Sequence, residues 1–278
     1  MRMDRYKNEY EEQQKKRVSK RRVLLIVIFV SIVIIAAEVA TLLTMTSIDR
    51  SFPRSVEYAL YEGWDLPVNE LQLQTTGRIT DTAFIDIEME AVSRYANKNY
   101  KDDELSRLAS EYISAIKACQ QAASQYDPAT EPDAFWNAFS EPYGRRLKVL
   151  YKMHNGDFHF TPDKKQYADE SAYILAQGWL LNATDNLSFK RTDEGNVSHY
   201  DAELKNESGL GIEYLDLEVE LLDASGKVKE TSSVYITDAD IDENMHLRFI
   251  GTSDKVTEYR IVSETCKFKE REEETDEA

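Results

Sequence analysis

Two short clusters in this sequence contain the side chains that most often bind metal ions. The first is the run His-Asn-Gly-Asp-Phe-His, in which His154, Asp157 and His159 fall within six residues. Imidazole and carboxylate groups suit a transition metal, and the Asn-Gly turn could bring the three together. No helix or strand is predicted to fix their geometry, so we interpret the run as a solvated turn and predict no metal site.

The second cluster follows part of the pattern of a calcium-binding loop. Asp238, Asp240 and Asp242 occupy the first, third and fifth positions of that pattern. The sixth position requires Gly and the twelfth requires Glu, but these positions hold Glu243 and Phe249. We therefore interpret the run as a loop between two strands.

No pattern in the chain indicates catalysis. The sequence contains no Gly-x-Ser-x-Gly motif and no phosphate-binding loop, and its four His residues do not define a triad. With 51 acidic residues, no pair of carboxylates can be singled out. Two cysteines, Cys119 and Cys266, are too few for a disulfide scaffold, and their pairing stays open. We predict no catalytic residue and no cofactor.

The most apolar stretch of the chain runs from Val23 to Met45 and contains a single charged residue, Glu38. As a helix it would be roughly 34 Å long, enough to cross a lipid bilayer. Residues 1–22 carry nine Lys or Arg and four acidic residues, and cations beside a span stay in the cytoplasm. The sequence therefore predicts a single-pass membrane protein with an uncleaved signal anchor, type II topology and a location in the cell membrane.

Glu38 is the unusual residue of this stretch. A carboxylate at membrane depth is costly unless it is paired, protonated or close to the interface. One interpretation is a contact with a Lys or Arg of another membrane protein, and Glu38 is our candidate partner contact. The other interpretation is that Glu38 lies in the outer third of the span and reaches the headgroups.

The charge of the chain is unevenly distributed. The formal net charge is −17, while residues 1–22 contribute +5, so the remainder carries −22. A strongly acidic remainder argues against binding to nucleic acid or to an anionic surface. It suits a cationic or neutral partner, or simply keeps the protein in solution.

Residues 79–186 show helical periodicity and predict an all-α bundle of about four helices. The clearest helix covers 102–126, with Asp102 and Asp103 at its N-terminus. Pro142 is expected to interrupt a later helix. Residues 46–78 before the bundle predict a linker with a short helix from Pro53 to Glu62. The aromatic residues of the bundle either form its core or line a ligand groove.

Near residue 187 the period of the apolar residues changes from 3.6 to 2. Leu215, Leu217, Val219 and Leu221 alternate with polar residues, which is typical of a half-buried strand. Further strands at similar spacing predict an immunoglobulin-like antiparallel β-sandwich over 187–266. Residues 267–278 predict an acidic, disordered tail.

The strand and turn of residues 217–228, Leu-Glu-Val-Glu-Leu-Leu-Asp-Ala-Ser-Gly-Lys-Val, resemble the FxLYD domain of bacterial, mainly Gram-positive, envelope proteins. Val219, Leu221, Leu222 and Asp223 stand at the four name-giving positions, two of which differ from the family. The upstream run Leu-Lys-Asn-Glu-Ser at 204–208 resembles the first strand of the family and its Asn-x-Ser turn. This resemblance implies an immunoglobulin-like sandwich outside the membrane and no catalytic residues.

These observations favour a non-enzymatic binding module of the cell envelope, membrane-anchored and extracytoplasmic. The expected partner is another envelope protein or a wall component. Two alternatives remain open: an envelope hydrolase with its site in the helical domain, and a membrane sensor that signals through Glu38 and the basic tail.

Overall fold

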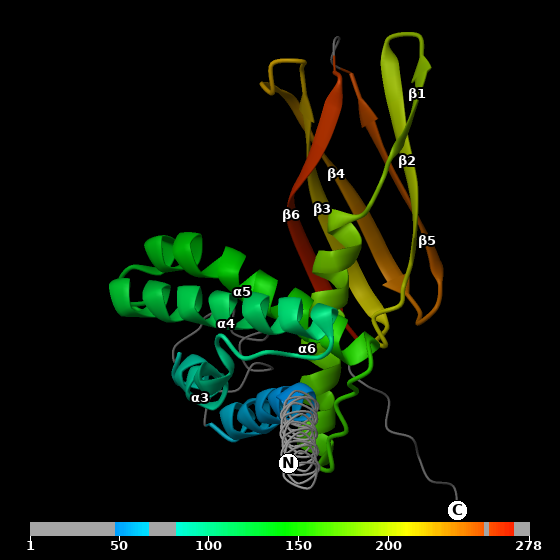
Figure 1. Cartoon of the computed structure of the whole chain (residues 1–278). Helices are drawn as coiled ribbons and strands as arrows, with labels where there is room; N and C mark the ends of the chain where they lie inside the picture. The colour runs from blue at the N-terminus through cyan, green and yellow to red at the C-terminus, as the bar shows by residue number, and fades with distance from the viewer. Residues whose placement is uncertain (1–47, 67–81, 253–255, 270–278) are drawn as a thin grey trace, which may run out of the picture.

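The computed structural model describes residues 48–66, 82–252 and 256–269. In these ranges helices come first and strands follow (Figure 1). The helices are residues 48–64, α3 (Ala83–Val92), the 3-10 turn η1 (Ser93–Tyr95), α4 (Asp103–Gln125), α5 (Pro132–Asn155) and α6 (Lys165–Asp185). The strands are β1 (Lys190–Glu194), β2 (Val197–Lys205), β3 (Ile212–Leu222), β4 (Val228–Ala239), β5 (Asn244–Gly251) and β6 (Glu258–Phe268).

None of the helices in the described ranges is both long enough and apolar enough to cross a bilayer. Helix α4, for example, is amphipathic, because Arg107 is exposed and Tyr112 is buried. This finding contradicts the predicted class of single-pass membrane protein, together with its type II topology and its location in the cell membrane. The predicted span, Val23–Met45, and the candidate contact Glu38 lie outside the described residues.

Local sequence explains the helix limits that were predicted well. The carboxylate of Asp102 accepts a hydrogen bond of 3.0 Å from the backbone N–H of Leu105, so Asp102 caps α4 where the sequence placed its start. The predicted interruption at Pro142 is wrong, because α5 continues through this residue. Pro142 is buried, and the packing of Phe139 and Leu147 on either side offsets the hydrogen bond that proline cannot donate.

The strands form two three-stranded antiparallel sheets, in the orders β1-β2-β5 and β4-β3-β6. Their inner faces pack together, and β3 buries alternate residues as its sequence predicted. In the first sheet Tyr200 pairs with Phe249, and their rings stack 4.6 Å apart. The turn after β3 contains Gly226 with φ of +78°, a conformation that glycine adopts without strain.

Two details of the sheets differ from the sequence prediction. Strand β1 was not anticipated, because all five of its residues are exposed and show no alternation. Strand β6 continues to Phe268, which is buried in the core, so the sheet extends beyond the predicted boundary at residue 266. Residues 270–278 of the predicted tail lie outside the described ranges.

Helix α6 connects the helical part to the sandwich. Its first half contributes Tyr167 and Ile174 to the core of the helical part, and its second half contributes Trp179 and Leu180 to the core of the sandwich. Figure 1 shows α6 crossing α5 and continuing to the base of the sheets. The helical part and the sandwich therefore share one structural element.

Candidate functional site

The structure places the predicted His cluster at the end of α5. The rings of His154 and His159 are 5.4 Å apart between centroids, and His154 Nδ1 accepts a hydrogen bond of 3.0 Å from the N–H of Phe160. Burial and the neighbouring His159 lower the pKa of His154. Asp157 is exposed. Among the described residues, no three His, Cys, Asp or Glu side chains are close enough together to hold a metal ion.

The second predicted cluster is neutralised by lysines. Lys269 Nζ lies 2.8 Å from Asp238 Oδ1 and 2.9 Å from Asp240 Oδ1. The ammonium group of this lysine therefore occupies the place that a calcium ion would take. Asp242 pairs with Lys205 at 2.6 Å. Lys269 and Lys205 therefore neutralise carboxylates in and beside the loop between β4 and β5, and these paired carboxylates offer no calcium site.

The two cysteines are free and lie in different cores. Cys119 is buried in the helical part, and Cys266 packs against the core of the sandwich. Burial raises the pKa of both thiols to about 12. A thiol with such a pKa is a poor nucleophile at neutral pH.

A buried ion pair that the sequence did not reveal joins three helices. Arg146 of α5 and Glu88 of α3 are 0% and 1% exposed, and Arg146 Nε donates to Glu88 Oε2 at 2.8 Å. The hydroxyl of Tyr112 in α4 donates to the same oxygen. The Arg146 guanidinium also lies over the rings of Phe84 and Tyr143. This network is closed to solvent and holds the helices together, so it is not a ligand site.

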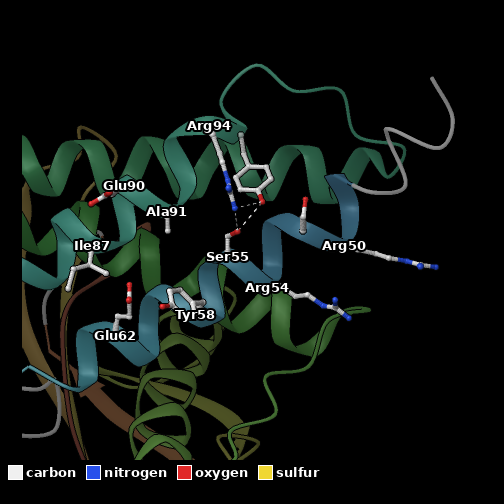
Figure 2. A pocket seen from close by; sticks show the side chains of 11 residues that line it. Arg50, Arg54, Ser55, Tyr58, Glu62, Ile87, Glu90, Ala91 and Arg94 are labelled. Atoms are coloured by element: carbon white, nitrogen blue, oxygen red, sulfur yellow. Dashed lines mark hydrogen bonds between the residues drawn. The ribbon is translucent and has the colours of Figure 1, made fainter. Parts of the chain in front are cut away.

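The best candidate for a ligand site is a groove between the helix of residues 48–64 and α3, which we call the α3 groove. It has a volume of about 1040 Å³. Its lining residues are Arg50, Ser51, Arg54, Ser55, Tyr58, Glu62, Ile87, Glu90, Ala91, Arg94 and Tyr95. Figure 2 shows both helices and the side chains between them.

The two helices that form the α3 groove are antiparallel. At one end Ser55 contacts Tyr95, with 2.9 Å between the two hydroxyl oxygens. At the other end the backbones come close, because a Cβ added at Gly63 would lie 3.2 Å from the Cβ of Phe84. Contacts at these two ends fix the width of the groove.

One end of the α3 groove is cationic and well ordered. Arg94 Nη2 donates to Ser55 Oγ at 2.9 Å and to the hydroxyl of Tyr95 at 3.1 Å. Burial would raise the pKa of Tyr95, but hydrogen bonds with Ser51 and Ser55 and the charge of Arg94 outweigh it and lower the pKa. Arg50 and Arg54 add two exposed guanidinium groups on the same side (Figure 2).

The other end of the α3 groove is acidic. Glu62 and Glu90, one from each helix, line the groove and are both exposed. Tyr58 lies between the two ends and is 61% exposed, so its ring is available to a ligand. Ile87 and Ala91 supply apolar surface along the α3 side. The groove thus offers opposite charges at its ends and an apolar wall between them.

A second groove, of about 1060 Å³, lies where the helix of residues 48–64 meets the start of α4 and the end of α5. Arg50 and Arg54 line this groove too, but other charged groups in it already have protein partners. Arg107 pairs with Glu104 and Glu111, and Asp49 accepts a hydrogen bond from the backbone of Lys101. A ligand would have to displace these contacts, so this groove is the weaker candidate.

Sequence reasoning missed the α3 groove because residues 46–78 were interpreted as a linker. The sequence did contain a signal for this groove. Polar side chains recur every four residues and form one stripe on a helix: Arg50, Arg54, Tyr58 and Glu62. Ser51 and Ser55 lie beside this stripe. A polar stripe that faces another helix, as this one does, can line a groove.

Comparisons with known proteins add little. No protein-family model and no curated protein matches the chain. A solved structure, described as the structural characterization of IRMA from Escherichia coli, is similar at 18% identity over 29% of this chain and 76% of that chain, with a TM-score of 0.24. A similarity of this level carries no conclusion. The resemblance to FxLYD domains therefore stays a prediction.

One local feature is relevant to that resemblance. Asn206 of the Asn-x-Ser turn is fully buried, and its side-chain amide donates to the carbonyls of Leu210 and Asp240 at 2.9 Å. Its Oδ1 accepts a hydrogen bond of 2.7 Å from the Ser208 hydroxyl. The turn therefore fixes the loops at one end of the sandwich, which is a structural role.

Proposed function

We propose that this chain is a non-catalytic binding module whose ligand occupies the α3 groove. The observation that carries the proposal is the ordered cluster of Arg94, Ser55 and Tyr95 at one end of an open groove. Polar groups that are held in place before binding lose little conformational entropy on binding. The groove therefore has the properties of a preformed recognition site.

No observation favours the alternative of a hydrolase. Such an enzyme would need two carboxylates in contrasting environments, one to act as an acid and one as a base. The two carboxylates of the α3 groove, Glu62 and Glu90, are both exposed. The expected partner, another envelope protein or a wall component, also stays a prediction.

A thermal-shift screen of polar small molecules and peptides tests the proposal. A ligand that binds only the folded protein raises the melting temperature, by an amount that grows with the ratio of ligand concentration to dissociation constant. Ala91→Phe should fill the groove and abolish the shift. The control is Gln121→Phe, a similar change at an exposed position of α4, which should leave the shift intact. If Ala91→Phe keeps a wild-type melting temperature and every ligand shift, the ligand binds elsewhere and the proposal is wrong.

A further inference from the structure

We infer that the ligand of the α3 groove is a short zwitterionic molecule of the peptide class, whose carboxylate binds at Arg94 and whose ammonium group binds at Glu62 and Glu90. This inference rests on the proposed function and specifies its ligand. Three features of the groove support it: the carboxylate end, the ammonium end and the distance between them.

The cationic end is suited to a carboxylate. Arg94 is anchored through Nη2 alone, by Ser55 and Tyr95, and its guanidinium carbon lies 5.0 Å from the centre of the Tyr95 ring. A guanidinium carries five N–H donors in a planar fork that matches the two oxygens of a carboxylate. Arg50 and Arg54 strengthen the attraction for an anion on this side of the groove.

The acidic end is suited to a cation. Glu62 and Glu90 come from different helices and both line the groove. An ammonium group has three N–H donors and can reach two carboxylates at once. A simple anion such as phosphate would be repelled at this end, because it would meet two negative charges. The ligand must therefore carry both charges to use the whole groove.

The distance between the ends sets the length of the ligand. Glu62 lies seven residues beyond Ser55, which corresponds to roughly 10 Å along a helix. On the other side, Glu90 of α3 lies four residues before Arg94 of the 3-10 turn η1, which corresponds to roughly 6–8 Å. An extended peptide rises about 3.3–3.6 Å per residue, so two or three residues span this distance.

The middle of the groove fits a peptide backbone with small side chains. Ile87 and Ala91 provide an apolar wall, and the exposed ring of Tyr58 can pack against the backbone. A longer aliphatic zwitterion would present the same two charges, but it would lack the backbone amide groups of a peptide. A tripeptide is therefore the most direct probe.

Isothermal titration of the full chain with trialanine, N-acetyl-trialanine, trialanine amide and inorganic phosphate tests the inference. Trialanine should bind, and blocking either terminus should weaken binding about tenfold, because each block removes one charge-assisted contact. Phosphate should bind more weakly than trialanine.

Two groups of variants test which residues bind the carboxylate of the peptide and which bind its ammonium group. Arg94→Gln should weaken trialanine binding and abolish the difference between trialanine and its amide. The double variant Glu62→Gln with Glu90→Gln should abolish the difference between trialanine and its acetylated form. The control Arg260→Gln, in which the lost guanidinium paired with Glu220 on the sandwich, should behave as wild type.

Each result has a distinct meaning. Equal binding of the blocked and free peptides would overturn the inference, and so would binding of phosphate without binding of trialanine. In the second case the proposed function would still stand if Ala91→Phe blocked the phosphate. If no ligand of any class bound to the groove, the proposed function would fail as well.

Discussion

Glu88 has more influence on the helical part than any motif that the sequence displays. Its carboxylate is buried, receives hydrogen bonds from Arg146 and Tyr112, and connects α3, α4 and α5. A buried charge is tolerated only when it is paired and hydrogen-bonded. The network therefore favours this arrangement of the three helices over other packings of the same amphipathic segments.

Replacing Glu88 tests the importance of the network. Glu88→Gln leaves the Arg146 charge buried without its counter-charge, and we expect a loss of about 3–5 kcal/mol in the free energy of unfolding. Urea denaturation followed by circular dichroism measures this change. The control is Glu104→Gln, which breaks an exposed ion pair with Arg107 and should leave the urea midpoint unchanged. Similar midpoints for the two variants would contradict the structural role of the pair.

His154 should make stability depend on pH. Its pKa in the folded protein is below the ordinary value of 6.5, because the ring is half-buried and lies beside His159. A depressed pKa means that the unfolded chain binds the proton more readily, so this contribution is present above about pH 6.5 and is lost on acidification.

We therefore expect the melting temperature of the wild type to fall between about pH 7 and pH 5.5, and His154→Gln to reduce this fall. Gln does not titrate, and any weakening of the hydrogen bond from the N–H of Phe160 would lower stability at every pH alike. Ser110→Gln, at an exposed position of α4, introduces the same side chain without removing a titrating group, and this control should keep the wild-type fall. An unchanged pH profile in His154→Gln would show that the shift has no effect on stability.

At the scale of elements, the crossing of α5 and α6 determines where the sandwich is attached. The helices touch at Gly178, where an added Cβ would lie 2.3 Å from the carbonyl oxygen of Leu147 and 2.8 Å from the Cβ of Tyr151. No side chain fits there unless the two backbones separate. Close packing at this point therefore requires glycine.

Gly178→Ala should destabilise the protein by about 1–3 kcal/mol, because the extra methyl group overpacks the crossing. Gly144→Ala is the matched control within α5, where the added Cβ would meet only Leu181 Cδ1 at 3.5 Å. This second change should be neutral or stabilising, since alanine favours a helix by about 1 kcal/mol over glycine. Thermal unfolding of both variants measures the contrast. Equal effects would mean that the crossing is looser than the structure shows.

Elements with a strong periodic pattern could be predicted from the sequence, and α4 and β3 agree closely with prediction. Other features depend on tertiary contacts that local patterns do not encode. The exposed strand β1 is held by its register with β2, and Pro142 remains within α5 because its neighbours are buried. The buried pair of Glu88 and Arg146 lies 58 residues apart in the chain, so no short motif could reveal it.

The candidate site was missed for the same reason. The α3 groove forms between segments that the sequence analysis assigned to a linker and to a bundle. Arg94 and Ser55, which bond to each other at its cationic end, are 39 positions apart. The two metal-type clusters that the sequence displays do not lie at the groove, and nothing in the sequence indicated where the ordered polar residues would meet.

At the scale of the whole molecule, α6 joins two cores. Tyr173 packs against both the helical core and the sandwich core, with Ile174 on one side and Trp179 on the other. An element shared in this way couples the unfolding of the parts that it connects. The described part of the protein should therefore unfold as one cooperative unit.

Trp179→Ala tests this coupling. The change removes a large buried side chain from the sandwich core and should cost about 3–5 kcal/mol. Native-state hydrogen exchange should show that amide protection falls by similar amounts in β3 and in α4, although the buried residues of α4 belong to the other core. A loss of protection confined to the strands would mean that the two parts unfold independently.

The most direct test of the binding role is an amide chemical-shift map of the full chain, recorded while trialanine and the strongest hits of the thermal-shift screen are titrated. We predict that the largest shifts fall in residues 50–62 and 87–95, on the two helices that form the α3 groove. Shifts concentrated on the sandwich or around Asp157, or no shifts with any ligand, would contradict the assignment of this groove as the binding site.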